Sequence, residues 1–316
     1  MSYPRQVLPG SVYLVTRRCT QRQFLLRPDD ETNNAFVYCF AYAAKRAGIG
    51  VVAFIANSNH YHAVVVDTEG QIPKFLEVFH RLLAKHQNVL RGGRRENFWS
   101  AQQTSLVELI GADDIIAKTL YTLTNPVKDI LVERANEWPG ATSLQGTLDG
   151  TSLTAQRPRR FFRATGKMPA SVELAFVQPP ALMHLSRHDY RQTFVEGIQA
   201  IETEAYRERV RTGRRVLGRR AILAQSPFAR PSSHARRCEI NPRVAARDKG
   251  ARIEALLRIK AFRAAHAAAR QAWLAGLAAI FPPGTWSLRA LCAVVAGPTL
   301  SPMSSPVIEI GLAQAT

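Results

Sequence analysis

Apolar residues recur with two different spacings along the first half of the chain, and they divide it into alternating strands and helices. Short runs rich in β-branched residues are typical of strands, and longer stretches with apolar residues three and four positions apart are typical of helices. The predicted strands are residues 12–16, 51–56, 60–66 and 104–110, and the predicted helices are residues 30–47, 73–90 and 113–125. This order, β-α-β-β-α-β-α, predicts an α+β fold: a ferredoxin-like antiparallel sheet with helices mainly on one face.

The third predicted strand carries two histidines one residue apart. Because successive side chains of a strand point to opposite faces, His60 and His62 share one face and Tyr61 lies on the other. The residues that follow, 63–66, are apolar on both faces, which predicts a central strand that is covered on both sides. Two imidazoles on one rigid surface can share a divalent ion, and two purely structural histidines are the alternative.

The last predicted helix of this half presents a phenol beside an amide. Pro126 disfavours the α conformation in the residue before it, so the helix is predicted to end near Asn125. Tyr121 and Asn125 are then four residues apart and lie on the same face of the helix.

The second half of the chain has a different composition. Residues 140–152 are rich in Gly, Ser and Thr, which predicts a linker between a first domain, 1–145, and a C-terminal region, 146–316. That region is predicted to be mainly helical, with helices at 187–214 and 244–280 and a loosely ordered tail after Pro298. The basic segment 213–231 resembles a small DNA-binding region, and whether it forms a helix-turn-helix stays open at this point.

The net charge of the chain indicates which kind of molecule it binds. Lys and Arg total 42 against 24 Asp and Glu, a formal charge of +18, and such an excess favours polyanions. There is no N-terminal signal pattern and no apolar run long enough to cross a bilayer, so we expect a cytoplasmic protein that binds nucleic acid and no membrane. The cysteines show no CxxC spacing and are predicted to be reduced thiols: Cys19, Cys39, Cys238 and Cys292.

The motifs together resemble a known family. Asn59-His60-Tyr61-His62 before a hydrophobic strand, followed by Tyr-x-x-x-Asn-Pro-Val at 121–127, resembles the HUH single-tyrosine transposases, most closely the REP-associated tyrosine transposases. The supporting features are residues 13–18 with Gln21 and Arg22, Phe98-Trp99, and Glu137-Trp138-Pro139. The resemblance covers residues 5–145. Ser58 departs from it, because the family usually has proline there, and Tyr61 is bulky for the middle position.

The resemblance implies a metal-dependent transposase or endonuclease. Such an enzyme nicks and rejoins single-stranded DNA that contains a hairpin, a REP-like palindrome, through a covalent 5′-phosphotyrosine. Tyr121 is then the nucleophile, and His60 and His62 are metal ligands with Asn125 as the candidate third. Imidazole and amide-oxygen ligands with open positions suit Mg²⁺ or Mn²⁺. Relatives act as monomers or as homodimers that exchange tyrosine helices.

Several basic residues are candidate DNA contacts on the same grounds, and a solvated surface is the alternative for each of them. They are Arg17, Arg18, Arg22, Lys85, Arg94 and Arg95. On the helix at 73–90, the residues His80, Arg81, Lys85 and His86 fit a solvated face better than a DNA contact. Two other functions remain open: a non-catalytic nucleic-acid-binding protein on the same fold, and a metal-dependent hydrolase without a covalent intermediate.

Overall fold

The structure is a computed structural model that describes residues 3–93, 96–232 and 242–286. Four residues on which sequence predictions rest, Arg94, Arg95, Cys238 and Cys292, lie outside the described residues, as does the tail after Pro298. The described residues form two compact units, one within residues 7–258 and one of residues 3–6 with 259–286. The first unit contains every described candidate site residue.

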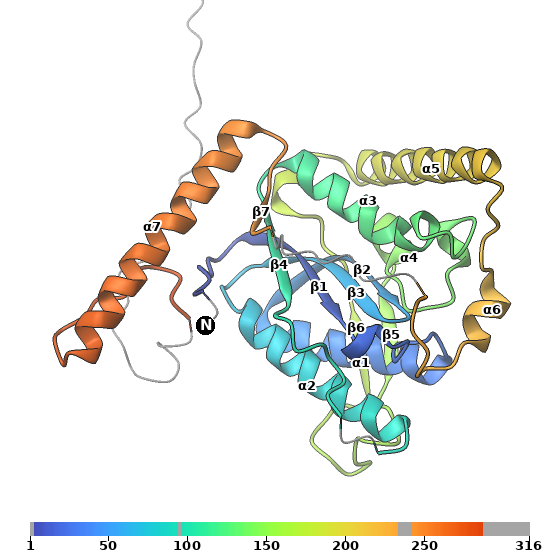
Figure 1. The fold of residues 1–316 in the computed structure, drawn as a ribbon, viewed down its shortest axis with the longest axis horizontal. Helices are drawn as coiled ribbons and strands as arrows, with labels where there is room; N and C mark the ends of the chain where they lie inside the picture. Colours follow the sequence, from blue (N-terminus) through green and yellow to red (C-terminus); the bar gives the residue numbers. More distant parts are fainter. Residues whose placement is uncertain (1–2, 94–95, 233–241, 287–316) are drawn as a thin grey trace, which may run out of the picture. The chain divides into compact units, whose positions relative to one another are not determined.

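A mixed sheet forms the centre of the first unit (Figure 1). Its strands are β1 (Ser11–Arg18), β2 (Ile49–Asn57), β3 (His60–Asp67), β4 (Ser105–Leu109) and β7 (Val244–Ala245). They lie in the order β2-β3-β1-β4-β7, and all neighbours are antiparallel except β4 and β7. The α+β class and the four predicted strands are therefore confirmed, and β3 is an inner strand as its apolar pattern predicts.

The described residues also form helices and one further hairpin. The helices are α1 (Asp30–Ala47), α2 (Ile72–Leu90), α3 (Ala112–Lys128), α4 (Leu144–Asp149), α5 (Arg187–Thr212), α6 (Arg219–Ala224) and α7 (Lys249–Leu274), with 3-10 turns η1 (Thr20–Arg22), η2 (Ala135–Glu137) and η3 (Pro180–Leu182). Strands β5 (Leu153–Gln156) and β6 (Ser171–Leu174) form the hairpin. None of the helices in the described part of the chain is long and apolar enough to cross a membrane.

One face of the sheet is covered by α1 and α2 through a layer of aromatic rings. Phe36 lies 5.2 Å from Phe79 and 5.6 Å from Phe54 between ring centroids, and Tyr61 of β3 lies 5.3 Å from Phe79. All four rings are fully buried. This packing fixes which face of β3 points to these helices. The layer accommodates the ring of Tyr61, and it would not accommodate the next residue of β3 if a shift of the strand put that residue in the place of Tyr61.

The other face is covered by α3 and by α5, so helices lie on both sides of the sheet. Val64 and Val66 of β3 pack there with Ile115 of α3 and with Tyr190 and Phe194 of α5. The helix α5 belongs to the region expected to follow a linker, yet it completes the core of the first half. The expected linker itself contains α4, whose Thr147 hydroxyl donates to the carbonyl of Val52 at 2.9 Å.

Two local predictions need correction. Helix α3 does not end near Asn125 but passes through Pro126 to Lys128. Proline removes one helical N–H, and burial of Pro126 and Val127 against the core compensates for that loss at the end of the helix. His80 and His86 do not lie on a solvated face of α2, because both are buried. The question left open for the segment 213–231 is also answered: the segment contains only the short α6 between extended stretches, so it is not a helix-turn-helix.

The second unit contains the end of α7 and the segment after it. Phe281 is fully buried against His266, with ring centroids 5.3 Å apart. Arg263 lies over the ring of Tyr3 at 4.9 Å, and Gln6 donates to the carbonyl of Pro283 at 3.2 Å. These contacts tie the two ends of the described chain together.

His86 should make stability depend on pH. Burial, then Arg91 and Arg160, lower its pKa to about 4 from 6.5. Between these values the unfolded chain binds a proton that the folded protein does not, so the free energy of unfolding rises with pH, by at most about 1.4 kcal/mol per pH unit for one group. We expect His86→Leu to give a shallower slope between pH 4 and 6.5 in urea titrations. An unchanged slope would contradict this assignment.

Candidate metal and tyrosine site

The two histidines converge because of strand pairing. On β3, His60 lies opposite Arg18 of β1 and His62 lies opposite Thr16, and both imidazoles point to the face that α3 covers. Their Nε2 atoms are 3.1 Å apart, and their ring centroids are 4.8 Å apart. The pairing of β3 with β1 therefore brings the Nε2 atoms of His60 and His62 next to each other.

The outer nitrogen of each ring has its own partner. His60 Nδ1 donates to Asn59 Oδ1 at 2.7 Å, and the amide nitrogen of Asn59 donates to the carbonyl of Arg22 at 3.3 Å. That second bond turns the oxygen of Asn59 toward His60, so the lone pair of His60 lies on Nε2. His62 Nδ1 lies 2.7 Å from the Thr16 hydroxyl, which can accept or donate. Partners of this kind orient metal-binding histidines.

Both imidazoles are neutral at physiological pH. Burial, then Arg18 and Arg22, lower the pKa of His60 to about 4. Burial, then His60 and Arg18, lower the pKa of His62 well below its ordinary value. A neutral imidazole keeps a lone pair for a cation, and it does not repel one.

Tyr121 reaches this point from α3 in the same chain. Its hydroxyl lies 3.4 Å from His62 Nε2, and the two rings are 5.0 Å apart between centroids. Burial, then Asp129, raises the pKa of Tyr121, whereas Arg18 and Asn125 lower it. The phenol therefore keeps its proton in this environment, and a nearby cation would favour the phenolate.

Asn57 belongs to the site and was not among the predicted residues. It ends β2 directly opposite His60. Its amide nitrogen donates to Asn125 Oδ1 at 2.8 Å and lies 3.1 Å from His60 Nε2. Its amide oxygen is buried and has no hydrogen-bond partner. The sequence predicts a hairpin of residues 51–56 and the histidine strand with Asn57 in a turn at 57–59; the structure has a two-residue turn at 58–59, so Asn57 ends β2 beside His60.

These residues fit a small divalent cation. The described residues contain no group of three or more His, Cys, Asp or Glu placed to hold a metal. The donor set here is instead the two imidazole nitrogens of His60 and His62 with the amide oxygen of Asn125, which faces them through the amide nitrogen of Asn57. Cis ligands at about 2.1 Å from one octahedral ion are about 3 Å apart. The two Nε2 atoms are separated by 3.1 Å, which matches.

Basic side chains surround the phenol. Lys118 and Lys128 place their Nζ atoms 6.0 and 5.7 Å from the centre of the Tyr121 ring. Arg18 acts on the pKa of His60, His62 and Tyr121 alike. Arg22 also lowers the pKa of His60. Of the predicted DNA contacts, Arg18 and Arg22 therefore lie near the site. Lys118 lies three residues before Tyr121, so the predicted helix period could have placed it there, whereas Lys128 lies beyond the predicted helix end near Asn125.

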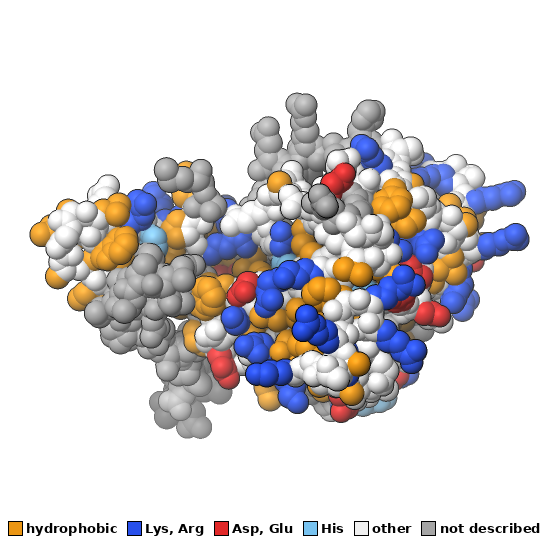
Figure 2. All heavy atoms as spheres, turned by 90° about the horizontal axis from the view of Figure 1, so that it is seen from below, with side chains coloured by type: hydrophobic (Ala, Val, Ile, Leu, Met, Phe, Trp, Pro, Cys, Tyr) orange, Lys and Arg blue, Asp and Glu red, His pale blue; other side chains and the backbone are white. Residues whose placement is uncertain are grey.

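Two other predicted DNA contacts lie on the opposite side of the sheet. Arg17 is paired with Tyr61, donates to His80 Nδ1 at 2.6 Å and lies over the Trp99 ring at 5.4 Å. Lys85 is exposed on α2, which covers that same face. Figure 2 shows Lys and Arg side chains spread widely over the face in view, so a basic residue is not by itself evidence for a place in the site.

The Thr16 hydroxyl should support cation binding through His62. Thr16→Val keeps the shape of the side chain and removes the partner of His62 Nδ1. We expect it to weaken Mn²⁺ binding by about 10-fold, since losing such an orienting partner costs about 10 to 100-fold in metal affinity. Calorimetric titration with Mn²⁺ measures this. Thr193→Val, on α5, is the matched control and should bind like the unmodified protein; an equal loss in both variants would count against the assignment.

Comparison with known proteins gives partial likenesses in fold. No family model matches the chain, and no curated protein matches it. A REP-associated tyrosine transposase bound to a REP hairpin has 15% sequence identity over 46% of this chain and 83% of its own, with a TM-score of 0.39. A candidate transposase from Deinococcus radiodurans R1 has 17% identity over 34% of this chain and 85% of its own, with a TM-score of 0.26. Both of these neighbours are transposases.

Proposed function

We propose that this protein is a metal-dependent enzyme that nicks and rejoins single-stranded DNA through a covalent tyrosine link, a transposase or strand-transferring endonuclease. The observation that carries the proposal is the 3.4 Å distance between the Tyr121 hydroxyl and His62 Nε2, beside the converging nitrogens of His60 and His62. A tyrosine nucleophile that is activated by a bound cation needs its hydroxyl close to the ligands of that cation, and this distance meets that need.

Each residue has a role in that chemistry. His60, His62 and Asn125 would hold Mg²⁺ or Mn²⁺, which when bound supplies positive charge to the phosphate and to the phenol. Tyr121 Oη forms a bond to phosphorus as the P–O3′ bond breaks; its proton goes to solvent, and the leaving 3′-oxygen takes one up. The products are a 5′-phosphotyrosine and a free 3′-hydroxyl, which can attack the link again and rejoin the strand.

The surroundings support a phosphodiester substrate. Arg18, Lys118 and Lys128 lie around Tyr121, and these cations attract a polyanion and stabilise its charge as it builds up during attack. The nucleophile and both imidazoles come from one chain, so the proposal needs no exchange of helices between subunits. A hairpin-containing single strand, as the family resemblance implies, is the proposed substrate.

The direct test is the covalent adduct. Incubating the protein with Mn²⁺ and a labelled single-stranded oligonucleotide that carries a hairpin should give a protein–DNA band that survives denaturing electrophoresis. Tyr121→Phe should give no such band, because it lacks the attacking oxygen, and it should still bind the oligonucleotide.

Tyr206→Phe is the matched control, because Tyr206 is an exposed tyrosine on α5. It should form the adduct normally. An adduct with the Tyr121→Phe variant would show that Tyr121 is not the nucleophile. Repeated cleavage without an adduct would favour a hydrolase, and binding without cleavage would favour a non-catalytic nucleic-acid-binding protein.

A further inference from the structure

Residues 213–231, here called the strap, form a basic segment that the site description leaves unexplained. It contains Arg214, Arg215, Arg219, Arg220 and Arg230 and no acidic residue. All five arginines are exposed. Within the described residues, Arg219 and Arg220 form no ion pair. Their charges are therefore available to a partner.

One end of the strap is bound to the residues that follow α3, the helix that carries Tyr121 and is here called the tyrosine helix. The backbone N–H groups of Leu217 and Gly218 donate to the carbonyls of Ile130 and Leu131, at 3.1 and 2.9 Å, just beyond α3. Ile222 of α6 is then buried in a cluster with Leu123 and Val127 of α3 and with other apolar residues. Backbone bonds and one apolar anchor thus hold this end and leave the arginine side chains out of the contact.

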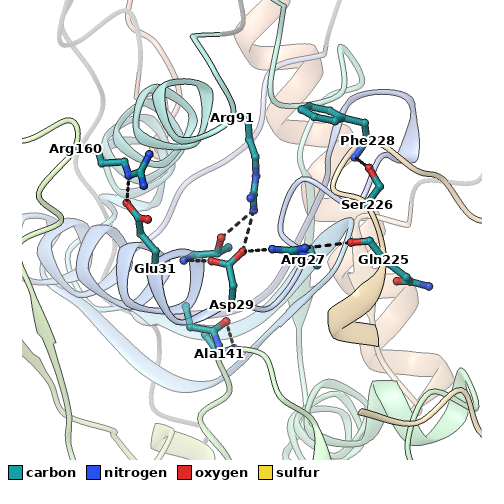
Figure 3. A network of polar contacts seen from close by, with 11 residues as sticks. Arg27, Asp29, Glu31, Arg91, Ala141, Arg160, Gln225, Ser226 and Phe228 are labelled. Carbon is teal, nitrogen blue, oxygen red and sulfur yellow. Dashed lines mark hydrogen bonds and ion pairs between the residues drawn. The ribbon is translucent and has the colours of Figure 1, made fainter. Parts of the chain in front are cut away.

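The other end is fixed to the segment that follows β1. Phe24 N–H donates to the carbonyl of Ala229 at 2.9 Å, and Gln23 donates to the carbonyl of Phe228 at 3.4 Å. Arg27, which also pairs with Asp29, donates to the carbonyl of Gln225 at 3.3 Å (Figure 3). The same segment begins at η1, where the Arg22 carbonyl accepts from Asn59, the partner of His60.

The strap therefore connects the two parts of the chain that supply the candidate site, α3 with Tyr121 and the β1 end beside His60. We propose that it is a binding surface for the sugar-phosphate backbone of the single strand next to the phosphate that is attacked. This inference rests on the proposed function. Contacts of this type are electrostatic and independent of sequence, so charge complementarity alone identifies the partner.

The test uses oligo(dT) as the probe and the double variant Arg219→Gln, Arg220→Gln. We expect its Kd for oligo(dT) to rise by about 10-fold, and the slope of log K against log salt to become shallower by about 1.4, since each lost phosphate contact contributes about 0.7 for single strands. The matched control removes two exposed charges from the far end of α1: Lys45→Gln, Arg46→Gln. It should bind like the unmodified chain.

Each outcome separates the strap from the catalytic proposal. Equal binding and equal salt slopes in both double variants would overturn the strap proposal while leaving adduct formation by Tyr121 intact. Weaker binding by the strap variant, in a protein that forms no adduct, would overturn the catalytic proposal and leave the strap standing as a nucleic-acid surface.

A second and independent observation concerns the amide of Asn57. Its nitrogen lies between Asn125 Oδ1 and His60 Nε2, and its oxygen is buried without a partner in a residue that is 2% exposed. Rotating the amide by half a turn exchanges these two atoms. The oxygen would then face the same point as the two imidazole nitrogens and the oxygen of Asn125.

From this arrangement we infer that Asn57 is an additional oxygen ligand of the cation, an inference that also rests on the proposed metal site. Mg²⁺ and Mn²⁺ prefer oxygen donors, and an unpartnered buried oxygen gains most from meeting one. Without a cation, the amide nitrogen serves instead as donor to Asn125 and lies against the lone pair of His60.

Titration with Mn²⁺ followed by the EPR signal of the free ion tests this without DNA or activity. Asn57→Leu should weaken binding by about 10-fold, and Asn57→Asp should tighten it by a similar factor, because a carboxylate is a stronger ligand for a hard cation. Asn88→Asp, on α2, is the control for an added charge. If both Asn57 variants bind like the unmodified protein while His60→Ala loses binding, Asn57 is not a ligand. If the unmodified protein binds no Mn²⁺, the metal site itself is wrong.

Discussion

The pairing register of β3 is the constraint on which the candidate site depends. Thr16 lies opposite His62 across one edge of β3, and Asn57 lies opposite His60 across the other. A slip of one residue would turn both imidazoles to the face of α1 and α2 and would bring Tyr61 to the face of α3. Packing opposes that slip, because the aromatic layer on one side and the valine layer on the other each accept only alternate residues of the strand.

Burial then sets the chemistry of the groups that the register brings together. Removing His60 and His62 from water penalises a proton on either ring, so both keep a lone pair. The same burial raises the pKa of Tyr121 and keeps its proton in place. Arg18 and the hydrogen bond with Asn125 partly offset this rise in the pKa of Tyr121. Under the proposed function, a divalent cation at the imidazoles would lower the pKa of Tyr121 further, so that the phenol would become a good nucleophile only with the cation bound.

Residues on both sides of position 145 build the unit that contains the site. Helix α5 buries Tyr190 and Phe194 against the sheet, and Ile222 packs with the end of the tyrosine helix. The region after residue 145 also carries most of the positive charge, with 26 basic and 11 acidic residues against 16 and 13 before it. One segment can therefore complete a core with its apolar residues and offer its arginines to a polyanion.

The sequence by itself determined the α+β class, the four strands, and the pairs His60 with His62 and Tyr121 with Asn125, because strand and helix periods are local properties of the chain. Only the tertiary structure decided that the two pairs meet, that Asn57 and Thr16 join them, and that Arg17 and Lys85 lie on the other side of the sheet. It also showed that His80 and His86 are buried and that α3 continues past Pro126. These outcomes depend on strand order and on packing between residues far apart in the chain, which no local pattern encodes.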